Sequence, residues 1–322
     1  MNKLLIIIIS ILLLTSCDKP ESPNNDKKIS QLELNDFLKN IKANLVYVEG
    51  GEFEMGDFGE KLYGAQIDPY PDSKPLHPLE LSSYSMSKFK ISNREYHLFL
   101  DYHHRSVRDV RDSLKDKWAE YNRTPDTPAR IDWYEGADYC AWLGKMTGLP
   151  FSLPTEAQWE YAARSRGQFM ILPTNTGKVE IEFDGGGKDR GINISTNYDR
   201  KLFARKNGTH LEELSSVPGD NYPPNSIGIY DMAGNGFEWV NDWYDPDYYK
   251  KSPKKNPQGP KKPEFEYDGK GYQKVMRSIN SYNGITGSTV GRTFRSPRVP
   301  EESIPSSQTA RCVVNSSEHI NY

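Results

Sequence analysis

The stretch Gly228-Ile-Tyr-Asp-Met-Ala-Gly-Asn-Gly-Phe-Glu-Trp-Val-Asn-Asp-Trp-Tyr244 gathers acidic, aromatic and glycine residues within seventeen positions. Asp231 and Glu238 supply carboxylate oxygens, and Gly234 and Gly236 let the backbone turn so that its carbonyls face the same ion. Four oxygens from eight residues predict a calcium site inside a packed domain. The alternative is an ordinary loop whose acids face water while its aromatic side chains fill the core.

The composition is that of a globular protein. The chain has 322 residues, of which 36% are hydrophobic and 12% aromatic, enough to build the core of one large domain or two ordinary ones. A net charge of −3 gives no general attraction to polyanions, so binding to nucleic acid is not expected. The run of lysines between Lys250 and Lys262 is interrupted by prolines and glycine, which is typical of a solvated loop.

Other common catalytic and metal motifs do not occur in the sequence. Among six histidines only His103 and His104 lie close together, and adjacent side chains diverge on a helix, so a zinc site is not expected. The chain has no Gly-x-Ser-x-Gly elbow, no phosphate-binding glycine loop and no His-Glu-x-x-His. Hydrolase and nucleotide-binding functions therefore lose their usual support.

The N-terminus has the pattern of an export signal. Lys3 precedes an apolar run over residues 4–14, which is too short to span a bilayer as a mature helix. The ending Leu14-Thr-Ser-Cys17 resembles a bacterial lipoprotein signal peptide over residues 1–16, whose cleavage leaves Cys17 to carry palmitate-type acyl chains. The alternative is a plain secretory signal with a chance cysteine. Asp18 resembles an inner-membrane retention signal, so we expect a membrane lipoprotein facing the periplasm.

The residues that follow predict a flexible tether and then a single folded region. Residues 17–44 are polar and contain prolines, so we expect a tether with one helical turn at most. Residues 45–48 and 53–55 flank a glycine pair and predict a hairpin. Capping patterns that start at Ser92, Asp132 and Thr155 predict three helices, the second of which stops at Gly148. Because glycines, prolines and short aromatic runs dominate after residue 167, we expect a loop-rich α+β domain.

Six segments of this sequence together resemble the sulfatase-modifying factor, or formylglycine-generating enzyme, family. They are Val48–Gly56, Ile91–Tyr96, Asp132–Trp142, Leu153–Arg164, Pro224–Trp239 and Ala310–Cys312. Any one of them alone would be weak, but six in the family's order make a specific match. The resemblance implies the family's irregular single domain, similar to C-type lectins and low in regular secondary structure, over residues 45–315, with a tail over residues 316–322.

The resemblance also implies bound calcium. One of the family's calcium sites takes oxygens at positions that match Asp231, the carbonyls of Gly234 and Gly236, and Glu238. The ion predicted from the acidic loop thus gains a context, and calcium is the expected cofactor.

The family's other calcium site corresponds to the region of Asn197 and Tyr198. Its acidic position falls on Leu211 in this sequence, with Glu212 and Glu213 beside it. The match is therefore weaker at the second site than at the first.

The resemblance places Cys140 and Cys312 where the family has a structural disulfide. Such a bond is compatible with export from the cytoplasm. The alternative is two separately buried thiols, because cysteine is common in protein cores.

The catalytic positions of the family differ in this chain. The family's oxidases use two cysteines to bind copper(I) and convert a substrate cysteine to formylglycine, and soft thiolates are what select copper(I). Counting back from Cys312 without gaps, these positions fall on Asn283 and Ser288, and a glycine pair before them is replaced within Arg277–Tyr282. We therefore expect neither copper binding nor formylglycine-generating oxidase activity.

Three functional hypotheses remain. The first is a lipid-anchored envelope lipoprotein that binds a protein partner as an accessory component of an envelope, secretion or toxin-immunity system. The second is a divergent, oxidoreductase-like enzyme of the same family that acts on a small metabolite or peptide through a pocket formed by Asn283, Ser288, Arg292 and Arg295. The third, a lectin-like carbohydrate binder, follows only from the likeness of folds. Relatives that are iron-dependent sulfoxide synthases carry an additional helical domain, for which the tether is too short.

Overall fold

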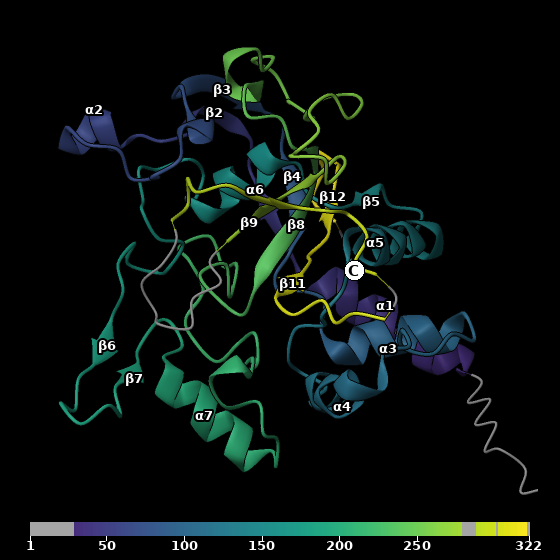
Figure 1. Ribbon diagram of the computed structural model, residues 1–322. Helices are drawn as coiled ribbons and strands as arrows, with labels where there is room; N and C mark the ends of the chain where they lie inside the picture. Colours follow the sequence, from purple (N-terminus) through teal and green to yellow (C-terminus); the bar gives the residue numbers. More distant parts are fainter. Residues whose placement is uncertain (1–28, 279–287, 301, 321–322) are drawn as a thin grey trace, which may run out of the picture.

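The computed structural model describes residues 29–278, 288–300 and 302–320, and two four-stranded sheets organise them (Figure 1). The first sheet has the order β1-β4-β12-β5, with strands β1 (Leu45–Val48), β4 (Tyr84–Ser87), β12 (Val313–Val314) and β5 (Phe151–Ser152). The second has the order β10-β9-β8-β11, with strands β10 (Thr293–Arg295), β9 (Lys274–Arg277), β8 (Phe237–Trp243) and β11 (Gln308–Thr309). Both sheets combine strands from distant parts of the chain, so the C-terminal residues complete the centre of the fold.

The helices and two small hairpins surround these sheets. Four helices gather on one side in Figure 1: α1 (Gln31–Ala43), α3 (Asn93–Tyr102), α4 (Lys115–Arg123) and α5 (Trp133–Thr147). The remaining helices are α2 (Gly59–Tyr63), α6 (Glu156–Ala163), which contacts β8 and β9, and α7 (Asn197–Lys206). The hairpins pair β2 (Gly51–Met55) with β3 (His77–Leu81), and β6 (Ile181–Glu182) with β7 (Arg190–Gly191). Short 3-10 turns are η1 (Pro71–Ser73), η2 (Asp112–Leu114), η3 (Glu212–Leu214) and η4 (Tyr248–Lys250). The α+β architecture with many loops agrees with the sequence prediction.

The three predicted helix starts are confirmed. Ser92, Asp132 and Thr155 each cap a helix with the side chain, and the third residue of each helix returns a hydrogen bond to the cap backbone. Such boxes satisfy amide groups that the first turn leaves unpaired. Helix α5 ends at Gly148, which has a left-handed φ of 71° that glycine adopts without strain.

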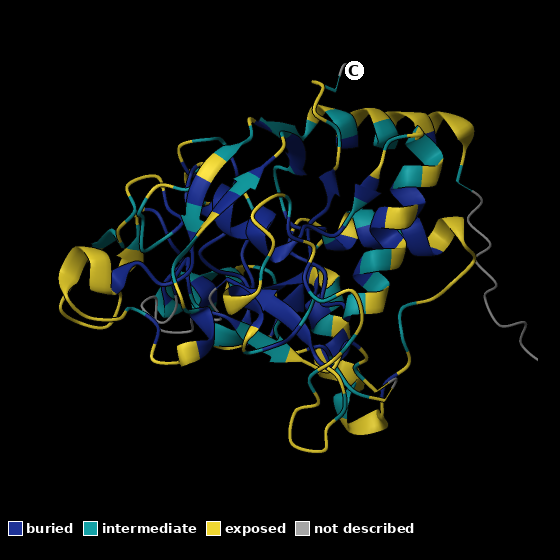
Figure 2. Ribbon diagram, turned by 90° about the horizontal axis from the view of Figure 1, so that it is seen from above, coloured by how far each residue is buried: buried dark blue, intermediate teal, exposed yellow. Residues whose placement is uncertain are grey.

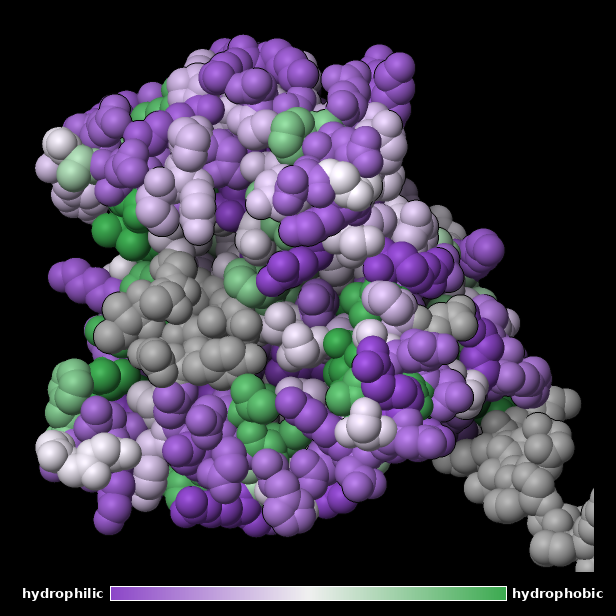
Figure 3. All heavy atoms as spheres, viewed as in Figure 1, coloured by the Kyte–Doolittle hydropathy of each residue, from purple (hydrophilic) through white to green (hydrophobic). Residues whose placement is uncertain are grey.

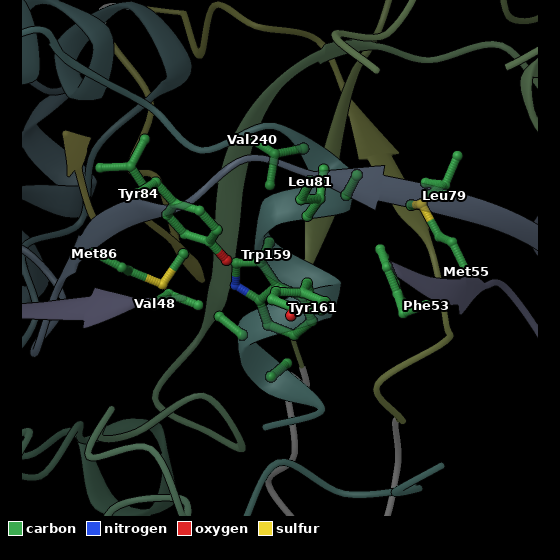
Figure 4. Close-up of a cluster of buried hydrophobic side chains, with 14 of the residues drawn as sticks. Val48, Phe53, Met55, Leu79, Leu81, Tyr84, Met86, Trp159, Tyr161 and Val240 are labelled. Atoms are coloured by element: carbon green, nitrogen blue, oxygen red, sulfur yellow. The ribbon is translucent and has the colours of Figure 1, made fainter. Parts of the chain in front are cut away.

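Helix α6 lies at the centre of the main hydrophobic core (Figure 4). All eight of its residues are buried, and Trp159 is surrounded by side chains from both neighbouring sheets and from the β2–β3 hairpin. The Tyr84 hydroxyl donates a 2.7 Å hydrogen bond to the carbonyl of Gln158, which satisfies a buried polar group at the helix surface. Figure 2 shows this buried interior enclosed by exposed loops and helix faces. Because α6 is buried on every side, each of its charged side chains needs a partner of opposite charge.

The predicted hairpin over residues 45–55 is wrong. Strands β1 and β2 each form antiparallel ladders, but β1 pairs with β4 and β2 pairs with β3. The glycine pair between them carries the chain from one sheet to the next. A Cβ atom on Gly50 would lie 2.2 Å from the carbonyl oxygen of Leu81, so this crossing requires glycine.

The prediction that residues 17–44 form a flexible tether is wrong for the part that the structure describes. Helix α1 has thirteen residues, and it buries Leu34 and Ile41 against the second core cluster. Phe37 contacts Trp142 of α5 with ring centroids 5.6 Å apart. The apolar residues in this segment recur at helical spacing, and the docking of α1 on α5 stabilises the helix beyond its local propensity. The folded domain therefore begins before residue 45.

The predicted tail over residues 316–322 is also wrong as far as residue 320. The ring of Tyr47 stacks on His319 at a centroid distance of 3.7 Å, and its hydroxyl donates to the carbonyl of Ser317 at 3.1 Å. Ile320 packs against the second core cluster. The C-terminal residues thus extend the folded domain past residue 315.

The predicted signal peptide and Cys17 lie outside the described residues. Within residues 29–278, 288–300 and 302–320, no helix is long and apolar enough to cross a membrane. The face shown in Figure 3 is mainly hydrophilic with scattered hydrophobic side chains. The lipid anchor at Cys17 therefore remains a prediction from the sequence.

Candidate functional site

The predicted disulfide is confirmed. Cys140 on α5 is bonded to Cys312, the residue directly before β12, and their Cα atoms are 5.7 Å apart. Both cysteines are buried in the second core cluster. The chain has three cysteines in all, and the third is Cys17, so the folded domain has no free thiol.

The predicted calcium ligands do converge, but a lysine ammonium lies among them. Lys90, between β4 and α3, donates hydrogen bonds from Nζ to the carbonyl of Gly234 and to that of Gly236, the second at 2.8 Å. The same Nζ is 3.6 Å from Oε1 of Glu238, and the side chains of Lys90 and Glu238 are 0% exposed. The oxygens of this loop therefore surround a positive charge. That charge is the side-chain ammonium of Lys90.

Arg311 binds the carboxylate of Glu238 on both oxygens. Its Nε donates to Oε2 at 2.6 Å, and its Nη2 donates to Oε1 at 3.0 Å. Burial alone would raise the pKa of Glu238, but Arg311 and Lys90 hold that pKa below its ordinary value. Glu238 is therefore an ionised carboxylate at the centre of a buried ion cluster.

Asp231 faces the same cluster from the start of the loop. Its Oδ2 accepts a 2.8 Å hydrogen bond from Nδ2 of Asn235. Burial raises the pKa of Asp231, and the ammonium of Lys90 opposes this shift. The loop is tightly curled, and Gly236 adopts a φ of 105° with its Cα so close to Ser307 that a Cβ would lie 2.6 Å from the Ser307 carbonyl oxygen.

These residues do not fit a calcium ion as they are arranged. Calcium takes six to eight oxygen ligands, whereas both carbonyls here accept from Lys90 and both Glu238 oxygens accept from Arg311. In the described parts of the chain, no group of three or more His, Cys, Asp or Glu side chains is placed to hold a metal ion. The prediction of calcium at Asp231, Gly234, Gly236 and Glu238 did not include Lys90, whose ammonium contacts three of these four residues.

At the second predicted calcium site, too, the described residues form no group of acidic side chains that could hold an ion. Asn197 and Tyr198 form the first turn of α7, and Leu211 is buried. The neighbouring Glu213 carboxylate lies 3.5 Å from Nζ of Lys201, one turn further along α7. The carboxylates of this region are thus paired within the protein, since Asp199 accepts from Thr196 and Glu213 faces Lys201.

Arg292, one of the residues predicted to line a catalytic pocket, is buried in an ion pair. Its Nε and Nη2 donate to the two oxygens of Glu156 at 2.8 and 3.1 Å. Its Nη1 donates to the carbonyl of Asp72 at 2.6 Å. All of these donors have protein partners, so Arg292 belongs to a buried ion network.

The other predicted pocket residues do not form a group with Arg292. Ser288 is buried, and its Oγ accepts a 3.1 Å hydrogen bond from the amide of Gly291, which makes it a turn residue. Arg295 at the end of β10 is exposed. Asn283 lies outside the described residues. The described part of the chain therefore gives the predicted catalytic pocket no support.

A network of buried ion pairs, which sequence reasoning missed, lies around α6. Glu156 accepts from Arg277 as well as from Arg292, and Glu160 accepts from Arg277 at 2.9 Å and from Arg164 at 2.7 Å. All five side chains are at most 2% exposed. The two carboxylates lie four residues apart on a helix that is buried all round, so each needs a cation, and the sequence alone does not show that burial.

The network continues to Asp242 on β8, whose Oδ2 accepts a 2.8 Å hydrogen bond from the amide of Glu156. Burial, and then the Glu156 carboxylate, raise the pKa of Asp242 to about 7. The unfolded chain releases this proton near pH 4 while the folded chain keeps it, so Asp242 lowers stability as pH rises from about 4 to about 7. We expect Asp242→Asn to be more stable than the wild type at pH 8 and similar at pH 4.5, measured as melting temperatures across this range. Parallel curves for the two proteins would contradict the assignment.

A surface hollow lies between α1 and the start of α3. Its volume is about 330 Å³, and Phe37, Ile41 and Phe89 line it together with Arg94 and Asp126. Arg94 and Asp126 form an exposed ion pair at 3.0 Å. Ser288, Arg292 and Arg295 are not among its lining residues. This hollow is therefore distinct from the position at which the family's chemistry is expected.

Comparison with known proteins identifies the family. A model of the sulfatase-modifying factor enzyme 1-like domain matches residues 33–303, and the chain belongs to this family. The match begins within α1, in agreement with the folded helix there. The formylglycine-generating enzyme of Streptomyces coelicolor is 28% identical over 274 residues, which cover 72% of this chain and 76% of that protein.

Two further likenesses define the extent of the match. The protein named serine/threonine-protein kinase pkn1 of Chlamydia pneumoniae is 28% identical over 235 residues, which cover 68% of this chain and 31% of that protein. This chain thus spans about a third of the length of that relative. The solved structure of PvdO from Pseudomonas aeruginosa superposes with a TM-score of 0.57 at 22% identity, covering 84% of this chain and 93% of PvdO. This superposition supports the fold.

Proposed function

We propose that this member of the family is a lipid-anchored envelope protein that does not generate formylglycine with copper. In this proposal it binds a protein partner as an accessory component of an envelope, secretion or toxin-immunity system. One observation carries the proposal: Cys140 and Cys312 are joined in a disulfide, and the remaining cysteine is Cys17. No thiolate pair is left in the domain to bind copper(I).

The residues at the family's cysteine positions support the same conclusion. Asparagine and serine offer an amide and a hydroxyl, which are hard ligands, whereas copper(I) is selected by soft sulfur. Ser288 is buried, and its Oγ accepts from a backbone amide. The Ser288 side chain stabilises a turn, which supports a structural role at a position where the family's oxidases have a catalytic cysteine.

The divergent-enzyme alternative receives less support. It needs arginines that face a substrate, and Arg292 instead has its donors on Glu156 and Asp72 within the core. The hollow beside α1 is lined by other residues, in which Phe37, Ile41 and Phe89 lie among polar and charged side chains that include the exposed pair of Arg94 and Asp126. That mixture suits a protein or peptide surface better than a site for acid–base chemistry.

The oxidase part of the proposal predicts that the purified full chain, supplied with copper(I), oxygen and a cysteine peptide bearing a sulfatase-type motif, yields no formylglycine. Mass spectrometry of the peptide measures the product. The Streptomyces coelicolor formylglycine-generating enzyme, assayed in parallel, is the positive control. Conversion of the peptide by this chain above the copper-only background would overturn the proposal.

The anchor part predicts that the protein sediments with membranes and incorporates labelled palmitate when it is expressed in a bacterial host. Cys17→Ser removes the acyl acceptor, so the variant should not incorporate labelled palmitate and should no longer sediment with membranes. Ser22→Ala, in the same N-terminal segment, leaves Cys17 in place, so it is the matched control and keeps the label. Equal labelling of the wild type and Cys17→Ser would refute anchoring at Cys17.

A further inference from the structure

We propose that the ammonium group of Lys90 takes the place of a calcium ion in this domain, so that the fold is held together at this point without any metal. The inference concerns the scaffold and does not depend on the proposed function. It follows from the place of Nζ among three oxygens that the family resemblance had assigned to calcium.

Lys90 has as many N–H donors as it has neighbouring acceptor groups. A lysine ammonium has three N–H donors and no acceptor. Two of them reach the carbonyls of Gly234 and Gly236, and the Glu238 carboxylate lies 3.6 Å away on the remaining side. The ammonium group, with its three donors, thus takes the place of a calcium ion that would bind the same oxygens.

The charges around Lys90 argue against a calcium ion in addition to the lysine. Two carboxylates face it, Asp231 and Glu238, and two guanidinium groups act on it as like charges, Arg311 and Arg130. With the ammonium, the cluster already has three positive groups for at most two negative ones. A divalent cation would add two more charges in a buried setting where repulsion is weakly screened.

Hydrogen bonds hold the backbone on both sides of Lys90, independently of its side chain. The carbonyl of Lys88 accepts from the amide of Tyr230 at 3.0 Å, and the amide of Ile91 donates to the carbonyl of Ala310 at 2.8 Å. Because neighbouring residues are anchored in this way, little freedom is lost when Nζ binds its oxygens. Lys90 is therefore preorganised for this contact.

The position of Lys90 gives it the structural role that a metal would have. It connects the segment between β4 and α3 with the loop before β8, and Glu238, the second residue of β8, pairs in turn with Arg311 near the C-terminus. Three segments far apart in the sequence meet at one buried cation. We infer that this domain keeps its stability at any calcium concentration that it encounters.

The first test uses calcium and a chelator on the purified full chain. We expect the same melting temperature in calcium chloride and in EDTA, because no calcium ion binds the folded state. Isothermal titration with calcium chloride should show no binding. A calcium-dependent rise in melting temperature, or a measured binding site in the titration, would overturn the proposal.

The second test removes the ammonium and keeps most of the side chain's volume. Lys90→Met leaves the carbonyls and carboxylates without their cation, so we expect the melting temperature to fall by roughly 5–10 °C. Lys88→Met is the matched control, since Lys88 lies two residues away and its ammonium lies over the rings of Phe89 and Tyr230 at 5.5 and 5.2 Å. Equal effects of the two substitutions would contradict a special role for Lys90.

A chemical readout covers the case in which Lys90→Met does not fold. Brief acetylation of the native wild-type protein, followed by peptide mass spectrometry, should label Lys88 readily and Lys90 only after unfolding, because the side chain of Lys90 is 0% exposed. Labelling of Lys90 at the rate of Lys88 in the native state would show that its ammonium is not held in the loop.

Discussion

Cys140→Ser is expected to lower the free energy of unfolding by about 4–5 kcal/mol, because the disulfide closes a long loop and restricts the unfolded chain. The two cysteines are 172 positions apart in the sequence. The loss should appear as a lower denaturant midpoint for the variant than for the oxidised wild type. It is among the largest effects that any single substitution in this domain should have.

The matched control for the disulfide is the wild type in reductant. Reduction should lower the midpoint of the wild type to near that of Cys140→Ser and leave the variant unchanged. The double variant with Cys312→Ser removes the unpaired thiol and tests for its side reactions. A wild type whose midpoint does not respond to complete reduction, confirmed by thiol titration, would contradict the expected contribution.

Glu156→Ala is expected to cost about 3–5 kcal/mol, because it leaves the guanidinium groups of Arg277 and Arg292 buried without their shared carboxylate. Glu156 Oε1 lies 2.8 Å from Arg277 Nη1 and 2.8 Å from Arg292 Nε. Denaturant unfolding followed by tryptophan fluorescence measures the loss, since Trp159 lies on the same helix.

Glu52→Ala is the matched control for Glu156→Ala. Glu52 also pairs with a cation, Lys254 at 2.8 Å, but both side chains are more than half exposed. Solvent screens such a pair, so its loss should change the denaturant midpoint far less than the loss of Glu156 does. Similar losses for the two variants would mean that the network around α6 does not depend on its charges.

The sequence predicted helices best where a cap and an apolar stripe coincide. Ser92, Asp132 and Thr155 were assigned correctly because each of these capping boxes precedes buried aromatic or aliphatic residues. Helix α7 has a box as well, with Thr196 and Asp199, but few apolar residues follow it. Its start signal was therefore not distinguished from an ordinary polar loop.

The strand partners and the cation could not be predicted from local sequence. A glycine pair between two short strands is compatible with a hairpin and with a crossing between sheets, and packing against Leu81 selects the crossing. The acidic loop shows which oxygens converge, but Lys90 lies 144 positions before Gly234. Lys88 and Lys90 alternate with Phe89 and Ile91, which is the ordinary pattern of an extended segment with one face in water, so the sequence carries no local signal that Lys90 is buried.

If Cys17 carries the proposed lipid anchor, the docking of α1 on α5 sets how far the domain can lie from the bilayer. With Cys17 as the proposed anchor and Gln31 as the first residue of the packed helix, only the thirteen residues 18–30 separate the two. A chain of this length reaches at most about 45 Å when fully extended. The domain would therefore search a thin layer next to the membrane, and a partner would have to present its own surface within that layer.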